Sequence, residues 1–259
     1  MNAKILLWLA LGMPPIVFFV GGTVTLFDAP LNTNGISSLS TAGWPVTGVA
    51  APAVIWDAAD PTGANVGTGA ETTTHAFTAT GTPTAVDTPF YPDGSHSDIS
   101  GCMKAMRFDG TNDYYTSNSA SIASPASADF TVCAVTRSDE GSIGEYGVVA
   151  ENRELVNGEG WTLGFEPTSD LIFTVENHAA AFTSRQAADN AGVNSWWITC
   201  GTSDHDGNVS AYGNVSSKQA PAAGPGGVIA PVIAMAIGAR QIGSYPIEGD
   251  IAAVFFWNS

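Results

Sequence analysis

Short runs of alternating apolar and polar residues, separated by turn-forming residues, follow one another along most of the chain. In residues 130–135 (FTVCAV), Phe130, Val132 and Ala134 fall on one side of an extended strand, and the residues between them fall on the other. Residues 171–176 (LIFTVE) alternate in the same way. This period of two is typical of half-buried β-strands. Such runs occupy residues 53–58, 75–80, 105–110, 129–135, 147–151, 160–166, 171–176, 195–201, 208–214, 233–239 and 250–257.

The spacing of these runs predicts the fold class. Strands about ten residues apart, with Gly, Asn and Asp between them, indicate an all-β antiparallel sandwich in which two sheets share one core. Helix signals are almost missing, and only residues 184–192 (SRQAADNAG) have a composition that suits one or two helical turns. No repeat of 20 to 50 residues is visible, which argues against propellers and solenoids.

The first 53 residues have a different character. Residues 1–27 carry a single charge, on Lys4, and form an apolar segment long enough to cross a bilayer, although Pro14 and Pro15 interrupt any straight helix. Three interpretations stay open: a membrane anchor or uncleaved signal, an arm buried in neighbouring subunits of an assembly, or a cleaved signal peptide. Residues 28–53, rich in Ser, Thr, Gly and Pro, read as a linker. All three interpretations predict a domain that works outside the cytoplasm, extracellular or on the surface of a virion.

The charge balance excludes some partners. The chain has 8 Lys and Arg residues against 24 Asp and Glu residues, a formal net charge of −16. Nucleic-acid binding needs clustered basic residues, and anionic lipid surfaces attract basic segments, so neither partner is expected. The acidic, charge-poor composition suits a soluble surface protein or a protein that binds cations.

The three cysteines are too few for a disulfide scaffold. Cys133 and Cys200 both lie in strand-like runs, so a bridge between them is conceivable. The favoured interpretation is nevertheless that all three, with Cys102, are small buried hydrophobic residues. No pair has the spacing of zinc ligands.

Several motifs, in order, resemble a known family. Residues 106–116 (MRFDGTNDYYT) end a strand in Phe-Asp-Gly before a turn, a later Trp leads into the hairpin Asp206-Gly207, and residues 249–257 (GDIAAVFFW) form a closing strand. This order resembles the laminin-G-like, concanavalin A-like jelly rolls of phage structural and secreted bacterial proteins. The resemblance covers roughly residues 54–259 and implies a lectin-like β-sandwich. One departure is Tyr212-Gly213-Asn214, where the family has Tyr-x-Asn-Gly.

The resemblance also implies a candidate cation, because members of this family often hold calcium near one rim of the sandwich. Calcium prefers several carboxylate and carbonyl oxygens. For each aspartate taken alone, a turn-forming role is favoured over a ligand role. The candidate calcium ligands are Asp109, Asp113, Asp204 and Asp206.

Aromatic residues near turns are candidates for stacking on sugar rings. Trp196 and Trp197 are consecutive in a strand, so one faces the core and the other faces outward. Core or interface packing is the commoner fate of the outward one. The candidate ligand-binding residues are Tyr114, Tyr115, Tyr146, Trp197 and Tyr245.

Catalysis has no support in the pattern of residues. Sandwich-fold glycosidases of this kind carry Glu-x-Asp-x-x-Glu within one strand, whereas Glu151, Glu154 and Glu159 have a different spacing beside a turn. A Gly-x-Ser-x-Gly nucleophile motif is also missing from the sequence. We therefore predict that the protein is not an enzyme.

The sequence favours a non-catalytic structural or attachment protein on the surface of a virion or extracellular assembly. On this hypothesis the apolar segment 1–27 contacts neighbouring copies, other subunits or a membrane. The alternative is a secreted or membrane-anchored carbohydrate-binding module assisted by calcium. A polysaccharide hydrolase or lyase is the third hypothesis.

Overall fold

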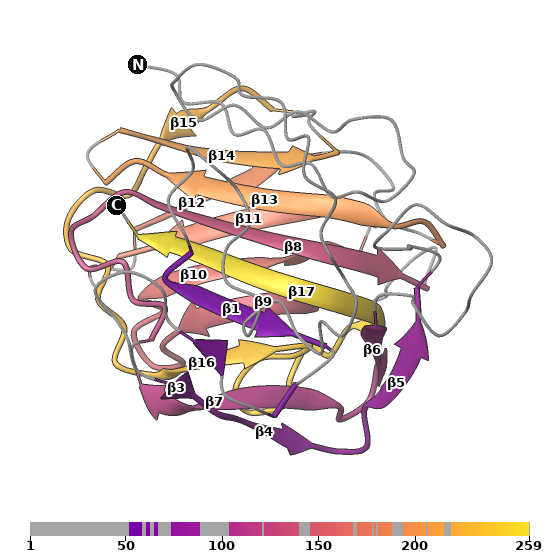
Figure 1. Ribbon diagram of the computed structural model, residues 1–259. Coiled ribbons are helices and arrows are strands. Elements are labelled where there is room, and N and C mark those ends of the chain that lie inside the picture. Colours follow the sequence, from indigo (N-terminus) through magenta and orange to yellow (C-terminus); the bar gives the residue numbers. More distant parts are fainter. Residues whose placement is uncertain are drawn as a thin grey trace, which may run out of the picture.

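Two large antiparallel sheets pack face to face (Figure 1). The computed structural model describes residues 52–58, 61–62, 65–66, 74–88, 104–120, 122–139, 146–167, 170–177, 179, 181–187, 194–205, 207–214 and 219–258. The expected arm at residues 1–27, nearly all of the expected linker at 28–53, Cys102 and Asp206 lie outside these residues.

Strands dominate the described residues, which contain no helix and therefore none long and apolar enough to span a membrane. The strands are β1 (Val54–Asp57), β2 (Asn65–Val66), β3 (Thr74–His75), β4 (Phe77–Thr80), β5 (Thr84–Asp87), β6 (Lys104–Asp109), β7 (Tyr114–Ala120), β8 (Phe130–Ser138), β9 (Gly147–Arg153), β10 (Gly160–Phe165), β11 (Leu171–Glu176), β12 (Phe182–Gln186), β13 (Trp197–Ser203), β14 (Asn208–Gly213), β15 (Ala222–Ala223), β16 (Ala234–Ile237) and β17 (Glu248–Asn258).

The larger sheet has eight strands, and the long strand β17 pairs with three of them, β8, β6 and β1. The order is β15-β14-β13-β8-β17-β6-β5, and β1 also pairs with β17. The first residues of β17 pair with β6, and later residues pair with β1 through the register Val54↔Phe256 to Asp57↔Ala253. The two short strands therefore flank the same side of β17 one after the other.

The second sheet has seven strands in the order β12-β11-β10-β9-β16-β7-β4. Its strands β9 to β12 follow one another in sequence and pair as an antiparallel meander. A meander of this kind places the outward side chains of four consecutive strands on one continuous surface.

Large aromatic side chains fill the space between the sheets. Trp161 of β10 stacks on Phe256 of β17 with ring centroids 5.8 Å apart, and its Nε1 donates a hydrogen bond to the carbonyl of Ala123 at 2.9 Å. Gly201 of β13 faces Phe173 of the other sheet so closely that a Cβ would overlap the phenyl ring. Burying an aromatic side chain of this size contributes about 1.5–3 kcal/mol.

The expected all-β sandwich is confirmed, and so is the alternation that predicted it. Phe130, Val132 and Ala134 belong to the core between the sheets, whereas Cys133 and Val135 lie on the outer face of the eight-stranded sheet. The helical turns expected from residue 184 onward are not formed as far as Gln186, because these residues pair with β11 as strand β12. Tertiary pairing here outweighs a weak local preference.

Cys133 and Cys200 are joined by a disulfide, contrary to the favoured interpretation that they are free. They are direct partners in the register of β8 and β13, with Cα atoms 4.1 Å apart. The sequence places both cysteines in strands, but only the pairing of those strands brings the sulfur atoms together.

Candidate functional site

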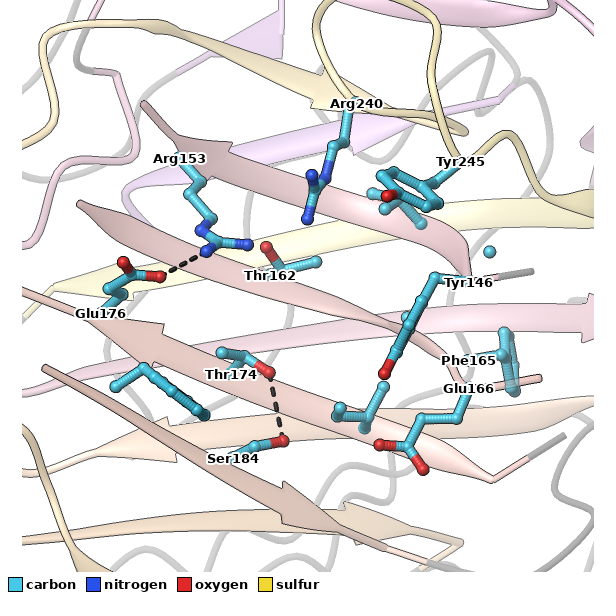
Figure 2. A pocket seen from close by; sticks show the side chains of 15 residues that line it. Tyr146, Arg153, Thr162, Phe165, Glu166, Thr174, Glu176, Ser184, Arg240 and Tyr245 are labelled. Atoms are coloured by element: carbon cyan, nitrogen blue, oxygen red, sulfur yellow. Dashed lines mark hydrogen bonds and ion pairs between the residues drawn. The ribbon is translucent and has the colours of Figure 1, made fainter. Parts of the chain in front are cut away.

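The candidate site is a pocket of about 340 Å³ on the outer face of the seven-stranded sheet (Figure 2). Its floor follows one row of the meander, in which Thr162 of β10 pairs with Thr174 of β11, and Thr174 pairs with Ser184 of β12. The residues on either side of Thr162 and Thr174 along their strands point into the core, so the hydroxyl groups face outward. The Oγ1 of Thr174 donates a hydrogen bond to the Oγ of Ser184 at 3.2 Å.

Two tyrosines and an arginine form one side of the pocket. Tyr146, just before β9, is 47% exposed and meets Tyr245 edge to face, with ring centroids 6.1 Å apart. The guanidinium of Arg240 lies 4.4 Å from the centroid of the Tyr245 ring. Figure 2 shows the hydroxyls of Thr162 and Thr174 between these tyrosines and the pair formed by Arg153 and Glu176.

The segment that carries Tyr245 is fixed to the sheet. The N–H of Val148 in β9 donates to the carbonyl of Tyr245 at 3.0 Å. Tyr245 has a φ of 53°, a left-handed conformation that is rare for a bulky residue and that the surrounding contacts must hold in place. The aromatic side of the pocket is therefore positioned before any ligand arrives.

The opposite side of the pocket combines an ion pair with an exposed aromatic ring. Arg153 donates from Nη2 to Glu176 and from Nε to the carbonyl of Gly158 at 2.9 Å. Phe182, at the start of β12, is 68% exposed and lines the pocket. Charged, hydroxyl and aromatic groups thus surround one cavity, which is the usual composition of a small-molecule site.

Glu151 lies beside the floor of the pocket and is only 1% exposed. Its Oε2 accepts a hydrogen bond from Thr162 at 3.3 Å and lies 3.6 Å from Nε of Arg240, and its Oε1 accepts from the N–H of Gln241 at 3.3 Å. Burial raises the pKa of Glu151 to about 7, and the positive charge of Arg240 opposes this rise. Glu151 therefore supports the segment that carries Arg240 and does not line the pocket.

The three glutamates considered for catalysis do not share a site. Glu154 accepts a hydrogen bond from the N–H of Val232 at 3.0 Å, and Glu159 accepts one from Ala230 at 2.6 Å. These two side chains hold the segment before β16, whereas Glu151 holds the segment after it.

The five aromatic candidates have separate fates. Tyr146 and Tyr245 line the pocket. Tyr114 is half-buried, with its ring over Gly243. Tyr115 is 2% exposed and packs against Trp56 and Phe108 in the core, so its ring has no face left for a ligand.

The two adjacent tryptophans point to opposite sides of the strand, as expected. Trp197, the proposed ligand-binding residue, packs against the core between the sheets, and Trp196 packs on the outer face of the eight-stranded sheet. The choice between them therefore needs correction, because the alternation shows that the faces differ but not which face is inner.

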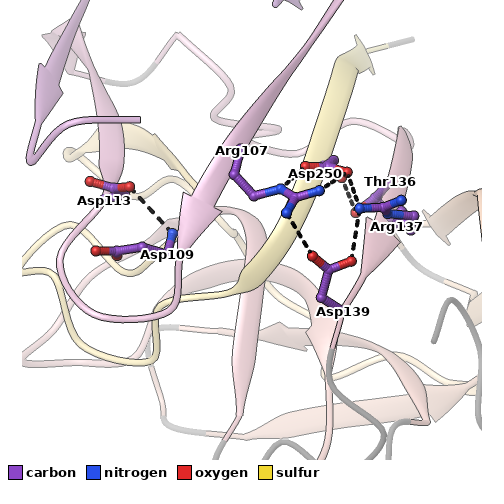
Figure 3. Close-up of polar contacts among 7 residues, drawn as sticks. All are labelled: Arg107, Asp109, Asp113, Thr136, Arg137, Asp139 and Asp250. Atoms are coloured by element: carbon purple, nitrogen blue, oxygen red, sulfur yellow. Dashed lines mark hydrogen bonds and ion pairs between the residues drawn. The ribbon is translucent and has the colours of Figure 1, made fainter. Parts of the chain in front are cut away.

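The carboxylates of Asp109 and Asp113 both accept hydrogen bonds from the backbone. Asp109 accepts from the N–H groups of Thr111 and Asn112 at 2.8 and 3.2 Å. Asp113 accepts from Thr82 at 2.6 Å and from Asp109 at 3.3 Å, and Figure 3 shows the latter contact. The contacts of Asp109 are the turn-forming role that the sequence favoured for single aspartates, whereas Asp113 also binds Thr82, 31 residues earlier in the chain.

Asp109 and Asp204 do not lie at the same rim of the sandwich. Asp109 pairs with Glu248 at the start of β17. Asp204 follows Ser203, whose partner Phe130 pairs with Asn258 at the end of β17. Ten residue steps of about 3.3 Å separate these ends by roughly 30 Å. Among the residues that the structure describes, no three His, Cys, Asp or Glu side chains converge in a way that suits a metal ion.

Sequence reasoning missed most of the residues that line the pocket. Thr162, Thr174 and Glu176 were visible only as the outward residues of alternating runs. The face they share with Arg240 and Phe182 depends on strand pairing, which no local pattern encodes.

Three solved structures with a similar architecture are binding domains of toxin proteins. The binding domain of botulinum neurotoxin serotype G superposes with a TM-score of 0.56 at 13% identity, covering 80% of this chain and 47% of that one. The receptor binding domain of botulinum neurotoxin D has a TM-score of 0.58 at 11% identity, with coverage of 81% and 49%. The binding domain of Paraclostridial Mosquitocidal Protein 1 has a TM-score of 0.53 at 11% identity, with coverage of 72% and 45%.

The likeness is one of fold. At these identities the comparison shows a shared all-β sandwich and nothing about ligands. The chain spans about half the length of the toxin domains it matches. No protein-family model and no curated protein sequence matches the chain, so the narrower likeness to laminin-G-like domains stays a prediction.

Proposed function

We propose that the protein is a non-catalytic surface module that binds carbohydrate in the pocket on the seven-stranded sheet. The observation that carries this proposal is the row of hydroxyl groups on Thr162, Thr174 and Ser184, flanked by the exposed rings of Tyr146 and Phe182. Sugars present apolar C–H faces that stack on aromatic rings and hydroxyl groups that exchange hydrogen bonds with polar side chains.

The structural neighbours support binding as the role of the fold. They are described as binding or receptor binding domains, and one botulinum neurotoxin D domain was solved in complex with N-acetylneuraminic acid. The pocket itself combines Arg153 and Arg240 with Glu166 and Glu176, so its charges balance. In a protein of net charge −16, this balance favours neutral sugars over acidic ones.

The disulfide between Cys133 and Cys200 supports a location outside the cytoplasm, because reducing compartments disfavour such bonds. We propose that the module is displayed on a virion or another extracellular assembly, as its resemblance to phage structural and secreted bacterial proteins implies. Immunogold labelling of intact particles or cells tests this placement, and label found only in the interior of lysed samples contradicts it.

A glycan array with neutral and sialylated oligosaccharides, run with and without EDTA, tests binding and calcium dependence together. We expect neutral oligosaccharides to be retained by the intact protein. Loss of that binding in EDTA identifies the calcium-assisted alternative, and unchanged binding excludes it. The absence of any retained glycan under both conditions contradicts the proposed function, and release of new reducing ends from a retained polysaccharide identifies a hydrolase instead.

The variant Tyr146→Ala then locates the site. Removing one stacking ring costs about 1 kcal/mol, so Kd should rise roughly five-fold. Val156→Ala is the matched control, because Val156 is exposed at the turn between β9 and β10 and does not line the pocket. Equal affinities for the two variants place the ligand elsewhere.

A further inference from the structure

Part of the outer face of the eight-stranded sheet is apolar, beside the charged network of Arg107, Arg137 and Asp250 on the same face. Antiparallel sandwiches normally present polar side chains on their outer faces. Here a second hydrophobic cluster lies on that face, and we call it the outer cluster. Its buried members are Ile55, Ala105, Cys133, Val135, Ile198, Cys200, Ala252, Ala253 and Phe255, with Val86, Trp196, Tyr212 and Trp257 packed against it.

The outer cluster is one-sided as far as the structure describes it. Its strand residues come only from strands of the eight-stranded sheet, and Trp196 directly precedes β13. Contacts between different sheets join the two large sheets to each other, or join the short pair β2–β3 to β1 and β7. No buried member of the cluster is nevertheless more than 5% exposed. A sheet face open to water would leave more of these side chains exposed.

Composition distinguishes the segments that are available for this role. The internal stretches 67–73, 89–103, 140–145, 188–193 and 215–218 are short or rich in polar residues and Gly, and residues 28–51 are rich in Ser, Thr, Gly and Pro. Residues 5–27 carry no charge and include Leu, Trp, Ile, Val and Phe side chains. An uncharged segment of that length needs an apolar surface to pack against.

The covalent connection to β1 favours residues 5–27 of the same chain, over a segment of another molecule, as the occupant of the outer cluster. The described part of the chain begins at Pro52 and enters β1 at Val54, and Ile55 is itself a member of the outer cluster. Residues 28–53, at about 3.3 Å each, reach up to roughly 85 Å, which exceeds the length of any strand in the sheet. A tethered segment has a high effective concentration at its own sheet, in contrast to a segment from another molecule.

We propose that residues 5–27 dock on the outer cluster of their own chain and form a third layer over the eight-stranded sheet. The occupant is thus a segment of this protein, in place of the neighbouring subunit or membrane expected from the sequence. In this arrangement the segment also covers the disulfide between Cys133 and Cys200, which lies within the cluster.

Photo-crosslinking on the full chain tests the proposal directly. p-Benzoylphenylalanine at Tyr212, half-buried beside the outer cluster, should form adducts with residues 5–27 in material that migrates as a monomer. The same label at Tyr146, on the opposite sheet, is the matched control and should form none. Adducts with residues 89–103, adducts between two chains, or the lack of any adduct at Tyr212 would each overturn the proposal.

Reduction of the disulfide provides an independent readout. Replacing Leu6, Leu7, Trp8, Phe18 and Phe19 by Ser keeps the length of the segment and removes much of its apolar surface. We expect dithiothreitol to reduce the disulfide several-fold faster in this variant, because thiol exchange requires access to sulfur. An unchanged rate contradicts the docking of residues 5–27, and it leaves the carbohydrate site on the other sheet unaffected.

Discussion

Cys133 and Cys200 face each other across the neighbouring strands β8 and β13 and join them by a disulfide on the outer face of the eight-stranded sheet. The link connects residues 67 apart in sequence. It therefore restricts the unfolded chain over a long loop and strengthens the contact at the centre of the sheet.

Removing this disulfide should destabilise the domain without changing its fold. We expect the double variant Cys133→Ala/Cys200→Ala to lose about 2–4 kcal/mol of unfolding free energy. Urea unfolding followed by tryptophan fluorescence measures this loss. The wild-type protein in dithiothreitol is the control and should lose a similar amount, whereas equal stability of the oxidised wild type and the double variant would show that the bond contributes nothing.

Asp250 holds a network of charges on the same sheet (Figure 3). Its carboxylate accepts from Nη2 of Arg107 at 3.0 Å and lies 2.7 Å from Nη2 of Arg137, while Asp139 contacts both arginines at 3.0 and 2.9 Å. The hydrogen bond to Asp250 is the main reason that the pKa of Arg107 is raised. The two aspartates thus balance the two arginines.

Substituting Asp250 should cost more than substituting Asp139, because Asp250 is buried and Asp139 is partly exposed. We expect Asp250→Asn to lower the unfolding free energy by about 1–3 kcal/mol, and Asp139→Asn by about 1 kcal/mol or less. Thermal unfolding at low and high salt measures both values. Equal losses for the two variants would contradict the central role of Asp250.

Glu151 should make the stability of the protein depend on pH. Its pKa rises on folding from 4.5 to about 7, so the folded state holds a proton that the unfolded state releases. Its contribution to stability is therefore present below pH 4.5 and is lost as pH rises to about 7, a change on the order of 3 kcal/mol. The control is Glu151→Gln, which does not titrate. Urea unfolding between pH 4.5 and 8 compares the two, and parallel curves would contradict the raised pKa.

Thr174 provides a polar test of the proposed carbohydrate site. Thr174→Val keeps the shape of the side chain and removes the hydroxyl that faces the pocket. We expect affinity for the retained glycan to fall roughly five-fold, as expected for one lost hydrogen bond of about 1 kcal/mol. Thr131→Val, on the other sheet, is the control. Isothermal titration calorimetry measures both, and equal affinities would contradict a direct contact.

Much of the sheet structure could be predicted, because alternation within a strand is a local property. The run at residues 171–176 shows this, since its odd-numbered residues enter the core and its even-numbered residues line the pocket. Strand β7 was harder to predict, because Ser and Thr dominate it after Tyr115. Strand β12 was mistaken for possible helical turns, because its polar residues depend on β11 for their conformation.

The candidate site was predictable only in part. Tyr146 and Tyr245, selected as aromatic residues near turns, line the pocket, and their ligand-binding role stays a prediction. Tyr115 was misplaced, because two consecutive tyrosines point in opposite directions and the sequence does not state which one points inward. Arg240 and Glu151 are 89 residues apart in the chain, so their contact could not be read from spacing.

Composition and alternation, read along the chain, were thus sufficient for the class of fold, the acidic surface and the uncharged segment at residues 5–27. Register, the disulfide, the hydroxyl row and the apolar outer cluster were decided only when the strands paired. The physical reason is that side-chain direction repeats every two residues and is written locally, whereas the neighbour of a strand is selected by contacts between residues far apart in sequence.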